Sequence, residues 1–349
     1  METKRCISSL TLEQLTAELK AMGQPGFRAK QIFHWVHQKL VTDFSAMTDQ
    51  PKALLAKLEE AFYIAAPIIE RRQEAKDGTV KYLLRMADGN CIETVVMRYH
   101  YGNTVCVSTQ AGCRMGCRFC ASTLDGLERN LRASEMLDQI YRIQTITGER
   151  VSNVVIMGSG EPMDNYDNVI RFLRLISHEK GLNISQRNLT VSTCGIVPGI
   201  LKFAKEGLQV TLALSLHAPN DEVRKTLMPV ANSYRLEDIL DACHTYFEAT
   251  GRRLTFEYSL VKGVNDNLKE AAALTKLIKD QHGHVNLIPV NPIKERSFVR
   301  STRQAVENFK IKLEKCGINV TIRREMGSDI DGACGQLRKS YMEKTESEK

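Results

Sequence analysis

Seven short apolar segments follow one another from about residue 104, and most of the intervals between them have the length and pattern of a helix. Alternation of buried strands with helices predicts an α/β fold in which helices cover a parallel sheet. The sequence has no glycine-rich dinucleotide-binding fingerprint, so a partial (β/α)6 TIM-like barrel is favoured over a doubly wound sheet. The predicted strands are Thr104–Thr109, Asn153–Met157, Leu189–Thr193, Val210–Leu216, Leu254–Leu260, Val285–Val290 and Val320–Arg323.

The chain before these segments follows a different pattern. Helix-like spacing of apolar residues extends to about residue 63, with a Gln-Pro-Gly helix breaker at residues 24–26. Short strand-like stretches follow, separated by two Asp-Gly pairs that are typical of hairpin turns. We therefore predict an N-terminal α+β accessory domain over residues 1–98, built from helices and a β-meander. The barrel is predicted over 99–330, and a mobile loop with a polar, frayed tail over 331–349.

Charge and cysteine content limit the class of protein. The net charge of +7 suits an RNA partner, although many enzymes with small substrates are equally basic. No apolar run is long enough for a transmembrane helix, and the N-terminus lacks the apolar core of a secretory signal, so we expect a cytoplasmic protein without a membrane partner. Ten cysteines in such a chain argue against a disulfide scaffold and favour metal binding or catalysis.

Three of these cysteines crowd into one short loop after the first barrel strand. Cys113, Cys117 and Cys120 have C-x3-C-x2-C spacing, and thiolates are the ligands of iron–sulfur clusters. The three can hold three irons of a 4Fe-4S cluster and leave the fourth iron open to a substrate. A zinc site with a distant fourth ligand is the alternative, but the remaining cysteines form no second C-x2-C pair. The spacing is the signature of radical S-adenosylmethionine (SAM) enzymes, in which the open iron binds SAM.

Small and polar residues at the ends of later strands are candidates to bind SAM. The turn that contains Gly160 and Glu161 follows an apolar strand and resembles the glycine-rich motif that binds the SAM amino group in radical SAM enzymes. In parallel βα folds the C-terminal strand ends form one rim, where such groups converge. Each residue alone is more often an ordinary strand cap, and His217 is equally explained as a core histidine. The other candidates on this rim are Ser192, Ser215, Leu216, His217 and Asn291.

Two further cysteines stand apart from the cluster loop. Cys106 lies on the first barrel strand, and Cys334 lies near the C-terminus among small residues that predict a loop able to reach the barrel mouth. A single cysteine is usually a small buried hydrophobe, which is our interpretation of Cys194, Cys243 and Cys316.

At this point the sequence resembles a known family, the bacterial dual-specificity 23S rRNA and tRNA adenine carbon-2 methyltransferases of the radical SAM superfamily. The resemblance covers nearly the whole chain, with small departures at Ser159, Met163 and Gly332. A sister family that methylates carbon-8 of the same rRNA nucleotide shares the cysteines and is the alternative. The matching segments are QPGFRAKQIFHWV, CVSTQAGCRMGCRFCAS, MGSGEP, STCGIVP, SLHAPND, LMPV, NLIPVNP and IDGACGQL.

The resemblance implies a mechanism and assigns its residues. Cys334 accepts a methyl group from one SAM, a second SAM supplies a radical, and the activated methyl adds to the adenine. Glu93 then removes the ring proton, and Cys106 releases the product as a Cys106–Cys334 disulfide that a cellular thiol reductant reopens. The implied partners are 23S rRNA, tRNA next to the anticodon and an electron donor, with a monomer favoured. By its place on a meander strand, Glu93 would more usually be solvated. A zinc-stabilised RNA-binding protein without enzymatic activity is the remaining alternative.

Overall fold

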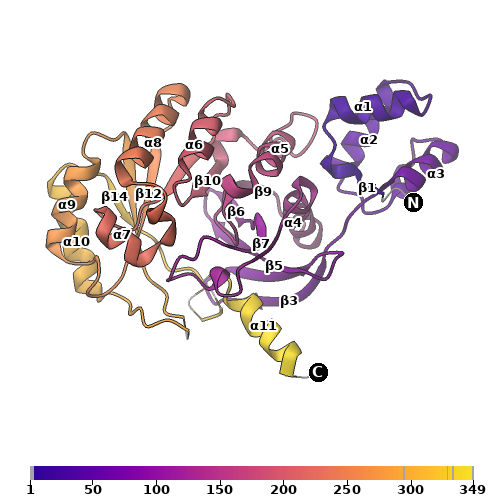
Figure 1. Ribbon diagram of the computed structural model, residues 1–349. Coiled ribbons are helices and arrows are strands. Elements are labelled where there is room, and N and C mark those ends of the chain that lie inside the picture. The colour runs from indigo at the N-terminus through magenta and orange to yellow at the C-terminus, as the bar shows by residue number, and fades with distance from the viewer. Residues whose placement is uncertain (1–3, 294, 328, 332–333, 348–349) are drawn as a thin grey trace.

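A ten-stranded sheet runs through the computed structural model, with helices around the outside of its strands (Figure 1). The structure describes residues 4–293, 295–327, 329–331 and 334–347, so Gly332 lies outside the described residues. The strand order is β14-β13-β12-β11-β10-β9-β6-β5-β4-β3, and its two edges, β14 and β3, do not pair with each other. The sheet therefore forms an open, partial barrel.

The barrel part of this sheet is parallel and follows chain order. Each apolar segment singled out from the sequence overlaps one of its strands, so the predicted fold class is confirmed. The parallel strands are β6 (Gly102–Cys106), β9 (Val151–Ile156), β10 (Leu189–Thr193), β11 (Thr211–Ser215), β12 (Leu254–Leu260), β13 (Gly283–Pro289) and β14 (Val320–Ile322).

Helices follow most of these strands and bury one apolar face each against them. In α5, Phe172, Leu173 and Ile176 are fully buried, and each such side chain contributes on the order of 2 kcal/mol by leaving water. The core thus lies between the sheet and its helices. The helices of the barrel are α4 (Ala133–Thr147), α5 (Tyr166–Ile176), α6 (Val197–Ala204), α7 (Asp221–Leu227), α8 (Leu236–Thr250), α9 (Leu268–Ile278) and α10 (Arg303–Lys315).

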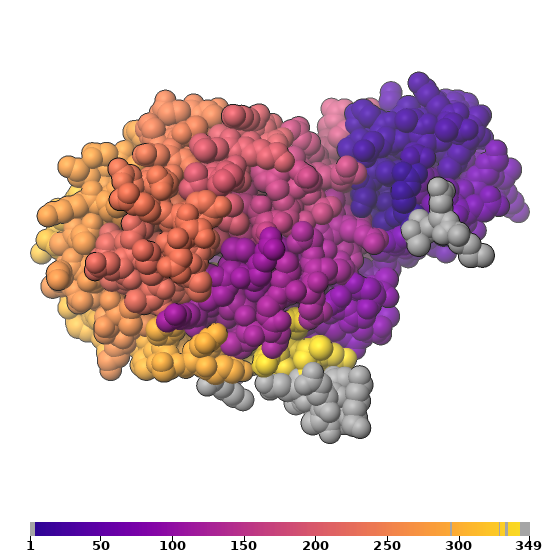
Figure 2. Space-filling model, viewed as in Figure 1, coloured from indigo at the N-terminus to yellow at the C-terminus, as the bar shows by residue number. Residues whose placement is uncertain are grey.

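An N-terminal helical module forms a separate lobe at one end of the molecule (Figure 2). The Gln-Pro-Gly break lies between its first two helices, as predicted, and its short strands pair in parallel. A hydrogen bond of 2.7 Å between His37 Nδ1 and the Tyr141 hydroxyl joins the module to α4. The elements of the module are α1 (Leu12–Ala21), α2 (Phe27–His37), α3 (Lys52–Ala61), β1 (Arg5–Cys6) and β2 (Phe62–Tyr63).

The β-meander extends the barrel sheet. Strands β3 (Ile68–Glu74), β4 (Val80–Arg85) and β5 (Cys91–Tyr99) are antiparallel, and β5 pairs directly with β6. Both Asp-Gly pairs are turns, in which Gly78 and Gly89 have φ of +82° and +88°. Hydrogen bonding therefore continues without a break across the domain boundary predicted at residue 98.

Three smaller features complete the fold. Strands β7 (Gln110–Gly112) and β8 (Leu127–Asn130) form a hairpin around the cysteine loop, and the predicted polar tail contains helix α11 (Gln336–Ser347). Within the described residues no helix combines the length and apolar character needed to cross a bilayer. The 3-10 helices are η1 (Ile7–Ser9), η2 (Phe44–Ala46), η3 (Ala121–Thr123), η4 (Pro162–Asn165), η5 (Gln186–Asn188) and η6 (Pro229–Asn232).

Candidate active site

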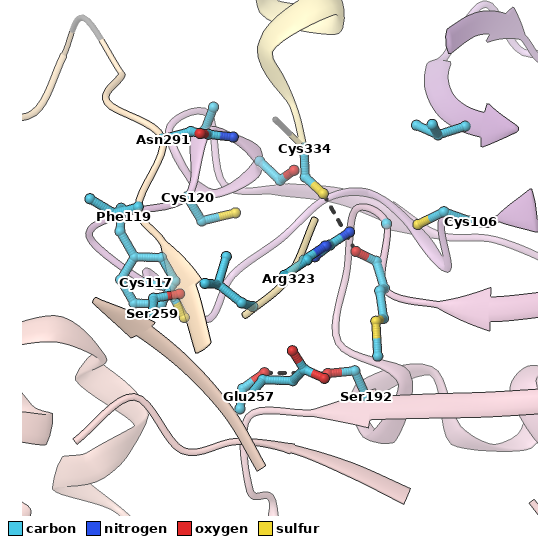
Figure 3. A pocket seen from close by; sticks show the side chains of 18 of the residues that line it. Cys106, Cys117, Phe119, Cys120, Ser192, Glu257, Ser259, Asn291, Arg323 and Cys334 are labelled. Carbon is cyan, nitrogen blue, oxygen red and sulfur yellow. Dashed lines mark hydrogen bonds between the residues drawn. The ribbon is translucent and has the colours of Figure 1, made fainter. Parts of the chain in front are cut away.

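A cavity of about 320 Å³ opens at the C-terminal ends of the parallel strands. This is the rim at which parallel βα folds gather their reacting groups. All three cysteines of the C-x3-C-x2-C loop line it, together with Cys106 and Cys334. Cys334 from the C-terminal segment therefore lines the same cavity as four cysteines of residues 106–120. Figure 3 shows four of these five thiols, those of Cys106, Cys117, Cys120 and Cys334.

The loop from Cys113 to Cys120 is shaped by its own hydrogen bonds. The Thr123 hydroxyl donates to the carbonyls of Cys117 and Cys120 at 3.0 and 2.9 Å, which turns the backbone back on itself. Gly112 starts the loop with φ of +74°, and a β-carbon there would lie 2.0 Å from the Gly126 carbonyl oxygen. Only glycine therefore fits where the loop leaves β7.

The three loop thiols fit a multinuclear cluster. Burial raises the pKa of Cys113 to about 11 and of Cys120 to about 12, and that of Cys117 rises through burial and the charges of its neighbouring cysteines. Among the described residues no three His, Cys, Asp or Glu side chains converge as ligands of one metal ion. A 4Fe-4S cluster binds each thiolate through a different iron, so its ligands need not meet at one point. Cys113, Cys117 and Cys120 line one cavity and offer the three thiols that such a cluster needs.

The glycine-rich turn after β9 packs tightly beneath the loop. A β-carbon on Gly158 would lie 2.7 Å from the Val107 carbonyl oxygen, and one on Gly160 would lie 2.6 Å from Thr109 Oγ1. Glu161 is buried and lines the cavity, and burial raises its pKa. Its carboxylate accepts the backbone N–H groups of Met163 and Cys194 at 3.0 and 2.8 Å, so it also fixes the end of β10.

Most of the other predicted SAM-binding residues share this rim. Ser192 and Ser215 line the cavity with their hydroxyl oxygens 3.3 Å apart, and Asn291 lines its far side. Leu216 does not belong to the described cavity lining, because its side chain is fully buried in the core. Six of the seven strand-end candidates thus line one cavity, and the exception is Leu216.

His217 is buried, and it also lines the cavity. Its φ is +58°, and its Nδ1 accepts the Ser259 N–H at 2.9 Å. Burial lowers the pKa of His217 to about 3, so the ring is neutral at physiological pH and carries its proton on Nε2. The ring also packs edge-on against Phe119, with centroids 4.8 Å apart. His217 can therefore donate one hydrogen bond without changing charge.

Cys106 and Cys334 approach the cavity from different directions (Figure 3). Cys106 ends β6, and Cys334 comes from the C-terminal segment, where its thiol donates to the Met157 carbonyl at 3.5 Å. Cys106 is buried, and burial raises its pKa to about 12 with the Cys334 charge as the second cause, whereas Cys334 itself is exposed. All ten cysteines are free thiols, so the expected Cys106–Cys334 disulfide is not formed in this structure.

Glu93 is placed differently from the expectation for a base. It is 5% exposed and is not among the described residues that line the cavity. Its carboxylate accepts the backbone N–H groups of Gly335 and Arg338 at 2.7 and 2.8 Å, and pairs with Lys81 Nζ at 2.9 Å. Glu93 is thus neither solvated nor free, because it caps the N-terminus of α11.

Sequence reasoning missed three charged residues at the site. Lys81 is fully buried on β4, and Arg224 is fully buried behind the loop, where it donates to the carbonyl oxygens of Cys194, Leu216 and Ser215. Arg323 reaches into the cavity between Cys334 and Glu257 (Figure 3). Arginine and lysine are usually surface residues, so nothing in the sequence alone distinguished these from solvated charges.

Family models match two parts of the chain. Residues 107–275 match the model described as "Radical SAM superfamily", and residues 7–64 match "Ribosomal RNA large subunit methyltransferase N-terminal domain". The first match contains the cysteine loop and the glycine-rich turn, and the second coincides with the helical module.

Whole-chain relatives and a solved structure give the same picture. A "Probable dual-specificity RNA methyltransferase RlmN" from Lachnoclostridium phytofermentans is 63% identical over 97% of this chain and 96% of its own length. The protein of the same name from Lachnospira eligens is 60% identical over 97% of both chains. The crystal structure of a radical SAM methyltransferase from Sphaerobacter thermophilus superposes with a TM-score of 0.91 at 43% identity, covering 95% of this chain and 98% of that one.

Proposed function

This chain belongs to the RlmN family of radical SAM RNA methyltransferases, and we propose that it methylates carbon-2 of adenosine in 23S rRNA and in tRNA next to the anticodon. It is a methyltransferase whose cofactors are a 4Fe-4S cluster and SAM. We choose this mechanism because Cys106, Cys334 and the three loop cysteines line one cavity.

The substrate explains why two extra thiols are needed. Carbon-2 of adenine lies between two ring nitrogens and is electron-poor, so it does not attack the methyl group of SAM. The methyl group must first be held by a nucleophile and then converted to a radical. In our proposal the thiolate of Cys334 is that nucleophile. It attacks the methyl carbon of the first of two SAM molecules, and S-adenosylhomocysteine leaves with the electrons of the broken sulfur–carbon bond.

The cluster ligands are assigned to Cys113, Cys117 and Cys120, while Gly160, Glu161, Ser192, Ser215, His217 and Asn291 are assigned to SAM. When bound there, the cluster would supply one electron to SAM, and the radical formed from SAM would remove one hydrogen atom from the S-methyl group of Cys334. The backbone of the glycine-rich turn presents carbonyl oxygens to the SAM ammonium group. Ser192 and Ser215 offer hydroxyls to its ribose or carboxylate, and His217 donates through Nε2–H.

Cys106 then releases the product. The methylene radical adds to the ring carbon, Glu93 takes the ring proton, and the unpaired electron left on the ring would return to the cluster that supplied the first electron. The Cys106 thiolate then attacks the sulfur of Cys334. The electrons of the broken sulfur–carbon bond pass to the methylene carbon, which takes up a proton and becomes the new methyl group. The resulting Cys106–Cys334 disulfide is reopened by a thiol reductant.

RNA binding is assigned to the N-terminal part of the chain. In this proposal residues 1–98 form the RNA-binding domain, residues 99–330 form the barrel, and residues 331–349 form the segment that carries Cys334. A family model named for a ribosomal RNA methyltransferase domain matches residues 7–64, and the net charge of +7 suits a phosphate backbone. The target adenine must leave its stack to enter the cavity, so a single-stranded or unfolded RNA region is favoured. We further propose a monomer that works in the cytoplasm with a separate electron donor.

The test is a covalent trap followed by analysis of modified nucleosides. Purified Cys106→Ala is expected to retain RNA covalently, because addition proceeds while release does not. Cys106→Ala/Cys334→Ala is expected to retain none. Absence of an adduct in the single variant contradicts the proposed release step. Mass spectrometry of rRNA and tRNA nucleosides from cells with and without the protein then separates 2-methyladenosine from the carbon-8 product.

A further inference from the structure

The segment that carries Cys334 is held at both ends by one buried ion pair. Lys81 donates to the Asp331 carbonyl oxygen at 2.6 Å, three residues before the thiol. Glu93 accepts from the N–H groups of Gly335 and Arg338, which follow it. Lys81 and Glu93 are 2.9 Å apart, 0% and 5% exposed, and lie on the adjacent strands β4 and β5.

Burying two opposite charges lowers the stability of a protein unless each charge makes all of its hydrogen bonds. Replacing such a pair with apolar residues of the same size often leaves the protein equally stable. Among the described residues, the other hydrogen bonds of the pair go to the backbone of Asp331, Gly335 and Arg338. Leu337 packs on Leu83 and Cys91 of the same two strands. The pair is therefore built to receive this segment and not only to join β4 to β5.

The same contacts hide the carboxylate of Glu93. In this arrangement the turn from Gly335 to Arg338 occupies both carboxylate oxygens, and Glu93 is not among the described residues that line the cavity. A bound adenine cannot give its proton to Glu93 until that turn has moved.

We propose that Lys81 and Glu93 form a dock that positions Cys334 to accept the methyl group and frees Glu93 as the base only when the segment moves away. Lys81 is then a positioning residue. The proton passes from carbon-2 to a carboxylate oxygen of Glu93, and the electron pair of the broken carbon–hydrogen bond stays in the ring. This ordering of steps rests on the proposed function, whereas the dock itself does not.

The test is hydrogen exchange in cluster-containing enzyme without RNA. In Lys81→Met and Glu93→Gln we expect the amides of residues 335–341 to exchange at least tenfold faster, while barrel strands keep wild-type protection. Lys81→Arg should restore part of the protection. Arg98→Met is the matched control, because it removes another ion pair of β5, with Glu149, that does not touch the segment.

Wild-type exchange at residues 335–341 in folded Lys81→Met would overturn the dock. If that variant does not fold, Lys81→Met/Glu93→Gln removes both buried charges, and slow exchange in this double variant would overturn the proposal equally. Intact mass gives a second readout, the fraction of Cys334 that carries a methyl group. We expect this fraction to be smaller in Lys81→Met than in the wild type, and an unchanged fraction would contradict a positioning role for Lys81. If the wild type shows no protection by Lys81 and Glu93 but methylates RNA normally, this inference fails and the proposed function stands. If the segment is protected as expected but adenosine is not methylated, the proposed function fails and the dock stands.

Discussion

Gly335 lies directly against the backbone of Ser122, so that a β-carbon at position 335 would be 2.4 Å from the Ser122 nitrogen. Gly335 follows Cys334, and Ser122 comes two residues after Cys120. The Cys334 segment and the proposed cluster loop are thus in contact through two backbones, with no space between them for a side chain at position 335.

Gly335→Ala is expected to keep Cys334 from reaching its position. The new methyl group meets backbone, and φ of +85° is unfavourable for alanine. We expect iron content near that of the wild type but at least tenfold less S-methylated Cys334 by intact mass. Gly207→Ala is the control, because Gly207 also has a positive φ, of +66°, with nothing within 4 Å of its β-carbon. Equal methylation in both variants would contradict the contact.

Release of the product should accelerate as the pH rises. The pKa of Cys106 is raised to about 12, so its thiolate fraction grows about tenfold per pH unit across the neutral and mildly basic range. Single-turnover formation of the Cys106–Cys334 disulfide is the rate to measure between pH 7 and 9. A flat profile would mean that the thiolate of Cys106 is not limiting, and Cys106→Ser should form no disulfide at any pH.

Acid should weaken the folded state through His37. Its pKa is lowered from 6.5 to about 3 by burial, so the folded protein binds fewer protons than the unfolded chain. The stabilisation is complete above pH 6.5 and declines as the pH falls from 6.5 towards 3, by about 1.4 kcal/mol per unit. Urea unfolding at pH 7 and 5 should show this loss in the wild type and a smaller one in His37→Gln. The exposed His244→Gln should behave like the wild type.

Arg224 should be essential for the shape of the site. Its guanidinium donates to carbonyl oxygens at the ends of β10 and β11, and leaving each buried acceptor unpaired costs on the order of 1–3 kcal/mol. We expect Arg224→Met to lower the melting temperature and the iron bound per protein. Arg235→Met, at an exposed residue, should change neither. Wild-type iron binding by Arg224→Met would show that the strand ends keep their places without it.

Local features of the sequence predicted the fold and most of the site. Strands of a parallel sheet are buried on both faces, so their apolar runs are continuous and stand out from the helices between them. The C-x3-C-x2-C loop is equally local, because its spacing alone brings three sulfurs near one another. The positions of Cys106 and Cys334 in the same cavity followed from the family resemblance and not from residue spacing.

Contacts between distant parts of the chain were not predictable in this way. Glu93 and Gly335 are 242 residues apart, and nothing near Glu93 indicates that it caps a helix. Lys81 stands in the strand sequence VKYLLR, where a lysine normally faces water, yet it is fully buried. The polar tail forms α11 because Leu337 and Tyr341 pack on β4 and β5, although its sequence has little apolar character.

The C-terminal segment packs on β4 and β5, which are translated much earlier. The two parts of this contact are therefore made at different times during biosynthesis. Every barrel strand leaves the ribosome before Cys334 does, so the cysteine loop is complete while the surface that Gly335 later covers is still bare. We therefore expect iron and sulfide to be loaded onto the cysteine loop before the C-terminal segment packs against Ser122.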